Sequence, residues 1–420
     1  MRAGESDQRI AMMSTASRAT RSSRPVVGHA ALHLPLFLVG WIYYLVVPLV
    51  AGFSGALDAM DAAEPVARYF SGQQRGMIAL ISYVALMPLA FIAGDRLSRI
   101  LRTPRPRPGI ARRSHWLLLC AYAVLLAAFT LAARDVLFAG YIDGVDSSLT
   151  GPIATMAMVI LFHYLSRQAD ECKSEARATG LLLVAACVVL LGMGGRLYMV
   201  TALVAIYFHW WHWLSRDRAA RIRSLVLVFA APLALALIGM WRIGSIDFTT
   251  LGFYLFAEAF FSSISALSLM LGNTWSWIDA PRDFFSAFLN IVPTVIWSDK
   301  GDFLVSLSDS LDFESPFGAM SILTSTIGKF GFFGGLAFIA AVGYLLGRAR
   351  LAARYPTARA LYCYLAAMLP FEFFRDPMQI QVKLVFTGFL LFWLYRFLAR
   401  RWVVLPRDSV SRERPSVAHG

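Results

Sequence analysis

The feature that most constrains this chain is a series of apolar blocks of about 18–24 residues, the length that a helix needs to cross a ~30 Å hydrocarbon layer. Within such a layer every backbone polar group must be bonded inside the protein, which a helix achieves. Hydrophobic residues make up 58% of the 420 residues and charged residues only 15%, far from the balance of a soluble protein. We therefore predict an all-α polytopic membrane protein.

The apolar blocks predict about ten transmembrane helices. The predicted spans are 30–53, 76–97, 115–139, 152–166, 179–195, 197–214, 224–241, 319–346, 360–374 and 381–399. A further apolar run, 251–271, is aromatic and interrupted by Glu258. We do not count it as a span, because the arginine residues of 348–359 would then lie on the outer side of the membrane.

Arginine residues are concentrated in alternate connections, at 99–113, 216–223 and 348–359, and again after the last span. Basic residues in short loops stay on the cytoplasmic side, so this pattern predicts that both termini are cytoplasmic. The arginine groups share one side only if 251–271 does not cross the bilayer. The net charge of +13 thus reflects topology and does not indicate a nucleic-acid partner.

The predicted organisation has five parts. They are a cytoplasmic tail at 1–29, a first bundle at 30–243 with seven spans, a long periplasmic segment at 244–318, the last three spans at 319–400 and a second cytoplasmic tail at 401–420. The segment 244–318 is acidic where the rest of the chain is basic. We expect 251–271 to lie in the interface or to dip in and return, and 284–297, broken by Pro293, to form a second shallow helix. We interpret the whole segment as the cover of an active site.

A few basic residues remain at the outer ends of the predicted spans, although basic residues usually lie on the cytoplasmic side. They are Arg134, Arg196, Arg242, Lys329, Arg375 and Lys383. A cation in hydrocarbon costs about 2.5–3.5 kcal/mol on insertion scales, unless it reaches the interface or a partner. The arginine fork binds phosphate oxygens in bidentate fashion and stays charged. Arg134, Arg196, Arg242, Lys329 and Arg375 are therefore our candidates for binding the phosphate or diphosphate of a lipid, and snorkelling at span ends is the alternative.

Arg196 stands out because it follows Gly192-Met193-Gly194-Gly195, a glycine-rich corner that lets backbone and guanidinium approach a ligand closely. Contacts of this kind would also stabilise a departing diphosphate, which makes Arg196 a catalytic candidate. Glu258 is the candidate general base, since a carboxylate in reach of a sugar hydroxyl can accept its proton. The alternative for Glu258 is a carboxylate paired with one of the outer arginines.

Four residues of the periplasmic segment are candidates for sugar contacts. They are Arg282, Asp283, Lys300 and Trp297. The charged residues could bind sugar hydroxyls or form local ion pairs. A tryptophan ring can stack on a sugar ring, although an interfacial aromatic belt explains the tryptophan equally well. No ligand set for a metal and no cofactor motif is evident, and we predict neither.

Three stretches resemble the Wzy-type oligosaccharide repeat-unit polymerases, the O-antigen polymerase-like membrane glycosyltransferases. The first is the corner Gly194-Gly195-Arg196 leading into a span. The second is the outer stretch with Phe284-Phe285, Ile291-Val292-Pro293 and Trp297-Ser298-Asp299-Lys300. The third is Gly328-Lys329-Phe330-Gly331-Phe332-Phe333-Gly334, followed by the late external Arg375.

The resemblance implies a membrane glycosyltransferase of the bacterial inner membrane with a periplasmic site. It would transfer the growing glycan from undecaprenyl diphosphate to the sugar end of an incoming lipid-linked unit, in O-antigen or exopolysaccharide biosynthesis. Its partners would be the undecaprenyl-diphosphate-linked oligosaccharide, the lipid bilayer, and a chain-length regulator and flippase of the same pathway. The alternatives are a flippase or transporter of lipid-linked sugars, and a ligase-like or single-sugar transferase that uses a polyprenyl lipid.

Overall fold

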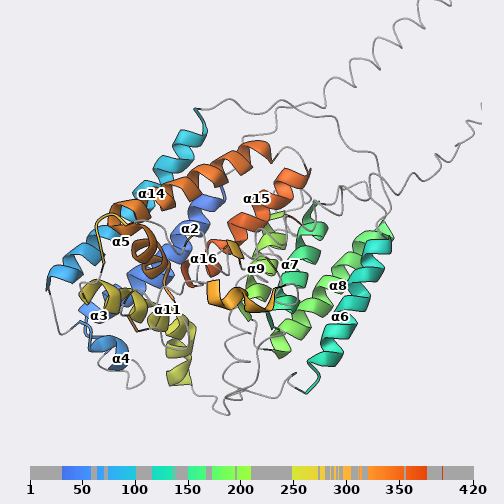
Figure 1. The fold of residues 1–420 in the computed structure, drawn as a ribbon, viewed down its shortest axis with the longest axis horizontal. Coiled ribbons are helices and arrows are strands. Elements are labelled where there is room, and N and C mark those ends of the chain that lie inside the picture. The colour runs from blue at the N-terminus through green and yellow to red at the C-terminus, as the bar shows by residue number, and fades with distance from the viewer. Residues whose placement is uncertain are drawn as a thin grey trace, which may run out of the picture.

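The computed structural model places most of the residues that it describes in helices (Figure 1). It describes residues 31–57, 64–70, 74–100, 116–135, 137, 150–166, 173–193, 196–209, 248–272, 275–279, 284, 288–289, 292, 297–303, 311, 313–314, 320–353, 356–375 and 390. No β-strand occurs in these ranges. Four helices among them are long and apolar enough to cross a membrane, at His33–Phe53, Gly76–Ser98, Ser174–Gly192 and Ile322–Ala352. The structure thus supports the predicted class, a helical membrane protein.

The first span is one continuous helical rod with a widened turn in its middle. It consists of α2 (His33–Trp41), the π-helical turn η1 (Ile42–Val46) and α3 (Val47–Phe53). Pro48 lacks the N–H that an α-helix would direct to the carbonyl of Tyr44, and the turn before it is wider than an α-helical turn. A short helix, α4 (Glu64–Ala67), follows the rod.

The second span, α5 (Gln74–Ser98), contains Pro88, which leaves the carbonyl of Val84 without its helical donor. The indole Nε1–H of Trp41 donates to this carbonyl over 2.8 Å. A proline that would weaken an isolated helix therefore supplies the acceptor that ties α5 to the first span.

Helices α5 and α14 (Ile322–Ala352) run side by side and in the same direction (Figure 1). Gly343 lies against the backbone of Phe91, and Gly94 lies against the backbone of Ala340, each so closely that an added Cβ would clash. Further along, Gly347 lies against the side chain of Ser98. Small residues let helix backbones approach in this way, which favours packing in a lipid environment.

The last turns of α5 and α14 and the start of α2 form a buried ionic cluster. Asp95 Oδ1 lies 3.1 Å from His33 Nε2 and 3.3 Å from Arg350 Nη2, and its Oδ2 lies 2.6 Å from Arg99 Nη2. The Nδ1 atom of His33 is 2.9 Å from the hydroxyl of Tyr362, in α15 (Pro356–Met368). The basic residues that follow the second and eighth predicted spans are therefore at one end of the bundle, together with the start of the first span.

Helix α14 is not the straight span that the sequence predicts at 319–346. At Gly331 the backbone has φ 74° and ψ 177°, a conformation that favours glycine. Thr326 lies 3.3 Å from the position of a Cβ on Gly335, although nine residues of straight helix would cover ~13 Å. The first part of α14, 322–330, is therefore folded back on the second part, 332–352.

The backbone groups freed at this break are bonded by an upstream segment, 275–279. The N–H of Asp279 donates to Phe330 O, that of Phe332 to Ser276 O and that of Phe333 to Trp277 O, each over 3.0 Å. A broken helix is tolerated at membrane depth only where other parts of the protein bond its free groups. The segment 275–279 supplies these bonds.

Helix α11 (Phe248–Leu271) is a single helix of 24 residues whose second half is enclosed by the rest of the bundle. It packs against η1, α3, α5 and α14. The Ser265 hydroxyl lies 2.9 Å from Thr324 Oγ1 and accepts the N–H of Ser321, the N-cap of α14. From Ala259 onward the helix expected to be shallow at 251–271 is thus mostly buried, because its serine-rich face bonds to the folded-back part of α14.

A second group of helices packs beside the first (Figure 1). It contains α6 (Trp116–Ala132), α7 (Thr150–Ser166), α8 (Lys173–Gly192) and α9 (Arg196–His209). Helix α7 is buried along most of its length by α8, α9 and α15, and α6 lies at the edge. These helices coincide with the predicted third to sixth spans, although α6 ends seven residues before, and α8 begins six residues before, the predicted position. The predicted spans 224–241 and 381–399 lie outside the described residues.

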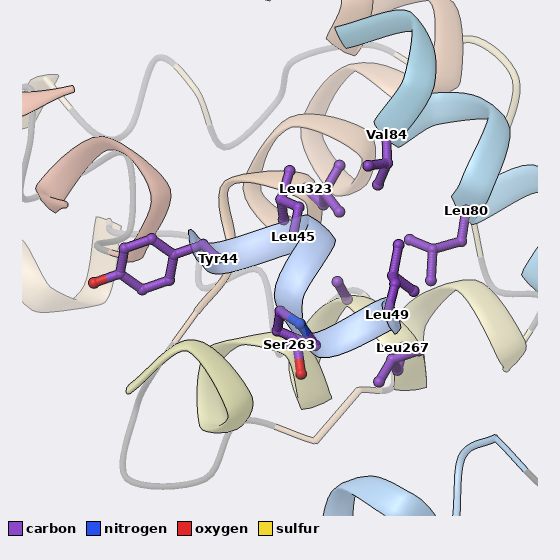
Figure 2. Close-up of a pocket in the computed structure, with 10 residues that line it drawn as sticks. Tyr44, Leu45, Leu49, Leu80, Val84, Ser263, Leu267 and Leu323 are labelled. Atoms are coloured by element: carbon purple, nitrogen blue, oxygen red, sulfur yellow. The ribbon is translucent and has the colours of Figure 1, made fainter. Parts of the chain in front are cut away.

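One small hollow lies between the first span, α5, α11 and α14 (Figure 2). Its volume is about 10 Å³, and Leu45, Leu49, Leu80 and Leu267 are among its lining residues. Figure 2 shows the Tyr44 ring directed away from these leucines. A volume of this size holds about one water molecule at most, and the lining is too apolar to hold one. The hollow is a packing defect beside η1 and not a site for an anionic ligand.

Candidate functional site

The candidate site is built around α16 (Glu372–Arg375), a single helical turn near the centre of the molecule (Figure 1). The sequence predicts a continuous span at 360–374, but α15 ends at Met368 and a turn at 369–371 precedes α16. Pro370 explains this break, because proline disfavours helical backbone in the residue before it. Helix α16 packs against α2, α9, α11 and α14, so four elements distant in sequence meet there.

Two of the predicted residues meet at this point. Arg375 Nε, on α16, lies 3.6 Å from Glu258 Oε2, on α11. The side chains are 33% and 48% exposed, respectively. A partly exposed pair of this kind contributes about 0–1 kcal/mol to stability. In this structure Glu258 is therefore paired with an arginine, which is the alternative interpretation that the sequence offered for it.

Tyr43 of the first span lies within electrostatic range of Glu258. The rings of Tyr43 and Phe256 are stacked 5.5 Å apart, and those of Tyr43 and Phe371 lie 6.1 Å apart. Glu258 therefore has an aromatic cluster in its vicinity, as well as the Arg375 guanidinium at 3.6 Å.

Glu372, one turn before Arg375, is fully buried and was not among the predicted residues. Its charge acts on Tyr364 in α15, which also lies in electrostatic range of Tyr198 in α9. Phe374 packs against the first span so tightly that a Cβ on Gly40 would lie 2.4 Å from its ring. Sequence reasoning placed Glu372 inside a span. The signal that could have found it is a Glu and an Arg three apart, directly after Pro370.

Helix α9 begins at Arg196, as the glycine corner predicts, and it packs against α16. Tyr198, in its first turn, lies close to Tyr364. Helix α9 as a whole thus contacts the turn that carries Arg375. The side chain of Arg196 itself lies outside what the structure describes.

Lys329 lies in the last turn of the folded-back part of α14 and is only 3% exposed. The carbonyl groups at a helix C-terminus favour a nearby cation. The span that the sequence predicts as one straight helix is therefore interrupted two residues after Lys329. The role of Lys329 in diphosphate binding remains a prediction.

The remaining predicted residues that the structure describes do not lie on α11 or α16. The Lys300 ammonium is turned inward and donates to the carbonyl of Val292 over 2.6 Å, and the Trp297 ring lies 5.2 Å from that of Phe303. Arg134 follows α6 at the edge of the molecule and forms an exposed pair with Asp135. Arg242, Arg282 and Asp283 lie outside the described residues, as does Lys383.

A second ion pair joins Arg68, after α4, to Glu314, whose backbone N–H donates to Ser268 Oγ of α11 over 2.9 Å. Burial, together with a hydrogen bond to Glu314, raises the pKa of the neighbouring Tyr69. Both members of this pair are about half exposed. It resembles the Glu258–Arg375 pair chemically but lies away from α16, which makes it a useful reference.

The arrangement at α16 can bind an anion through Arg375 and accept a proton at Glu258. Among the described residues no three His, Cys, Asp or Glu side chains are grouped so as to hold a metal ion. Comparisons with known proteins find no family model, no curated protein and no solved structure that matches this chain.

Proposed function

We propose that this chain polymerises lipid-linked oligosaccharide repeat units at the periplasmic face of the bacterial inner membrane. The contact between Glu258 and Arg375 carries the proposal, because it joins an acid and an anion-binding group from segments 117 positions apart (375 less 258). Helix α9, which begins at Arg196, packs against the same turn. A phosphate-binding cation and a proton acceptor are the two groups that glycosyl transfer from a diphosphate needs.

In the proposed reaction the acceptor hydroxyl oxygen attacks the anomeric carbon of the donor glycan. The bond from that carbon to the diphosphate oxygen breaks, and its electron pair leaves with the undecaprenyl diphosphate. Arg375 and Arg196 stabilise the leaving diphosphate through charge-assisted hydrogen bonds. Glu258 takes the proton of the acceptor hydroxyl.

The proposed topology has ten spans and cytoplasmic termini, with the segment 244–318 outside. The parallel packing of α5 and α14 supports this count, since 251–271 as a span would make these two helices antiparallel. The ionic cluster of Asp95 supports it too, because it gathers the basic connections at one end.

Deletion of the gene followed by gel analysis of surface glycan tests the function. A polymerase deletion loses long chains and keeps single-repeat caps. Arg196→Ala and Arg375→Ala, at equal membrane abundance, are expected to lose at least about 90% of the long chains, whereas Arg68→Ala keeps them. Normal chain length in both arginine variants of the site would contradict the proposal.

A flippase or transporter of lipid-linked sugars is the second candidate. The two broken helices favour it, because discontinuous helices carrying ionisable residues are typical of transporter sites. Lys329 and Glu372 lie at these breaks. The same deletion separates the two functions, since loss of a flippase removes all surface glycan and leaves lipid-linked units inside.

A further inference from the structure

The ion pair at the candidate site uses the two groups that the proposed reaction needs free. Arg375 must bind the diphosphate, and Glu258 must accept a proton, yet each is the partner of the other at 3.6 Å. The inference that follows rests on the proposed function and concerns how that site is controlled.

The contact between Glu258 and Arg375 is longer and involves fewer atoms than a strong ion pair. Charge-assisted N–H···O bonds are about 2.7–2.9 Å long, and the fork of an arginine can form two of them to one carboxylate. Here a single nitrogen, Nε, faces one oxygen at 3.6 Å. Both side chains are partly open to solvent, where such pairs are weak, although the Nε atom itself is buried. A diphosphate offers more charge and more acceptor oxygens to the same fork.

Glu258 would stay in place after losing this partner. It lies at the point where the buried half of α11 begins, directly before the buried residue Ala259. Tyr43 of the first span lies within range of its charge. A carboxylate on a helix anchored in this way cannot follow the arginine, so separation of the pair exposes it beside α16.

We propose that the Glu258–Arg375 pair is a resting state that the donor diphosphate opens. The diphosphate replaces the Glu258 carboxylate on Arg375, and the released carboxylate then accepts the proton of the acceptor hydroxyl. The bonds formed and broken in the transfer are those already described, and no further reactant is required. The site thus gains its base only when the donor is bound.

This exchange predicts an opposite effect of Glu258 on binding and on turnover. Removing its charge takes away a competitor for Arg375, so Glu258→Gln should bind a diphosphate about threefold more tightly, the gain that an exposed pair of this strength allows. The same variant should lose most of its turnover, because no base is released. A residue that only maintains the fold would weaken both.

The test uses the purified full chain in nanodiscs and farnesyl diphosphate as the probe, with affinity measured by calorimetry. Glu258→Gln and Glu258→Ala are expected to bind the probe about threefold more tightly, and Arg375→Gln at least tenfold more weakly. Glu314→Gln makes the same change in the Arg68 pair and should bind as the unaltered chain does. Equal or weaker binding by both Glu258 variants would overturn the exchange.

The two proposals fail in different ways. If the unaltered chain makes no polymer but Glu258→Gln still binds the diphosphate more tightly, the exchange stands and the polymerase function falls. If the chain polymerises and both Glu258 variants bind as it does, the function stands and the exchange falls.

Discussion

Asp95 shows how a single carboxylate can organise one end of the bundle. It contacts groups on α2 and α14 and an arginine of its own helix, while being almost fully buried. A buried charge of this kind is tolerated because its partners neutralise it. The cluster therefore holds three spans together at the basic end.

Replacing Asp95 by Ala is expected to destabilise the protein by about 3–5 kcal/mol, because Arg350 and His33 stay buried without their acceptor. Chemical unfolding in detergent, followed by tryptophan fluorescence, measures the loss. Asp135→Ala removes a carboxylate from an exposed pair and is the control, with an expected change below about 0.5 kcal/mol. Similar losses in the two variants would contradict the importance of burial.

At this scale the sequence indicates which charges are unusual but not which of them meet. Glu258 and Arg375 were both predicted from their apolar surroundings, and the structure places them in contact. Glu372 was missed, because a single acid among apolar residues looks like part of a span until Pro370 is seen to end the helix. Contacts between distant segments depend on packing, which no local pattern contains.

The break in α14 is the most consequential local feature of the fold. It depends on Gly331, whose positive φ angle suits glycine, and on three backbone hydrogen bonds from the segment 275–279. The two elements therefore form one structural unit, although about fifty positions of chain lie between them.

Gly331→Ala is expected to cost about 2–5 kcal/mol, from backbone strain and from a Cβ that would lie 2.7 Å from the backbone of Ile278. The midpoint of thermal unfolding in detergent reports the change. Gly301→Ala, at a position with nothing within 4 Å of its Cβ, should leave that midpoint nearly unchanged. A Gly331 variant as stable as the Gly301 variant would mean that the break is not held by these contacts.

Most elements could be predicted from the lengths of the apolar blocks. The first six predicted spans match described helices within a few residues at most ends. The break at Gly331 could not, and the break at 369–371, which Pro370 marks, was overlooked because the predicted span extends across it. A hydropathy average reports the apolar character of a stretch of sequence. It does not report where the helix axis changes direction.

At the scale of the whole molecule, the side of the membrane on which each connecting segment lies remains a prediction from charge. Alkaline phosphatase, which is active only outside the cytoplasm, is the reporter. Fusions after Gly301 are expected to be active, and fusions after Pro104 and Arg354 inactive, because the arginine-rich connections stay inside. Activity after Arg354 would show that 251–271 crosses the bilayer, and the ten-span arrangement would be wrong.

The glycine contacts between α5 and α14 limit how the molecule can move. Two spans whose backbones touch at Gly94 and Gly343 cannot slide past each other without steric clash, so they act as one rigid wall. If the chain acts on the proposed lipid-linked glycan, any widening of the bundle must come from helices other than this pair. The turn α16, where α2, α9 and α11 also meet, then becomes the joint about which they can separate, and cross-linking it would prevent that movement.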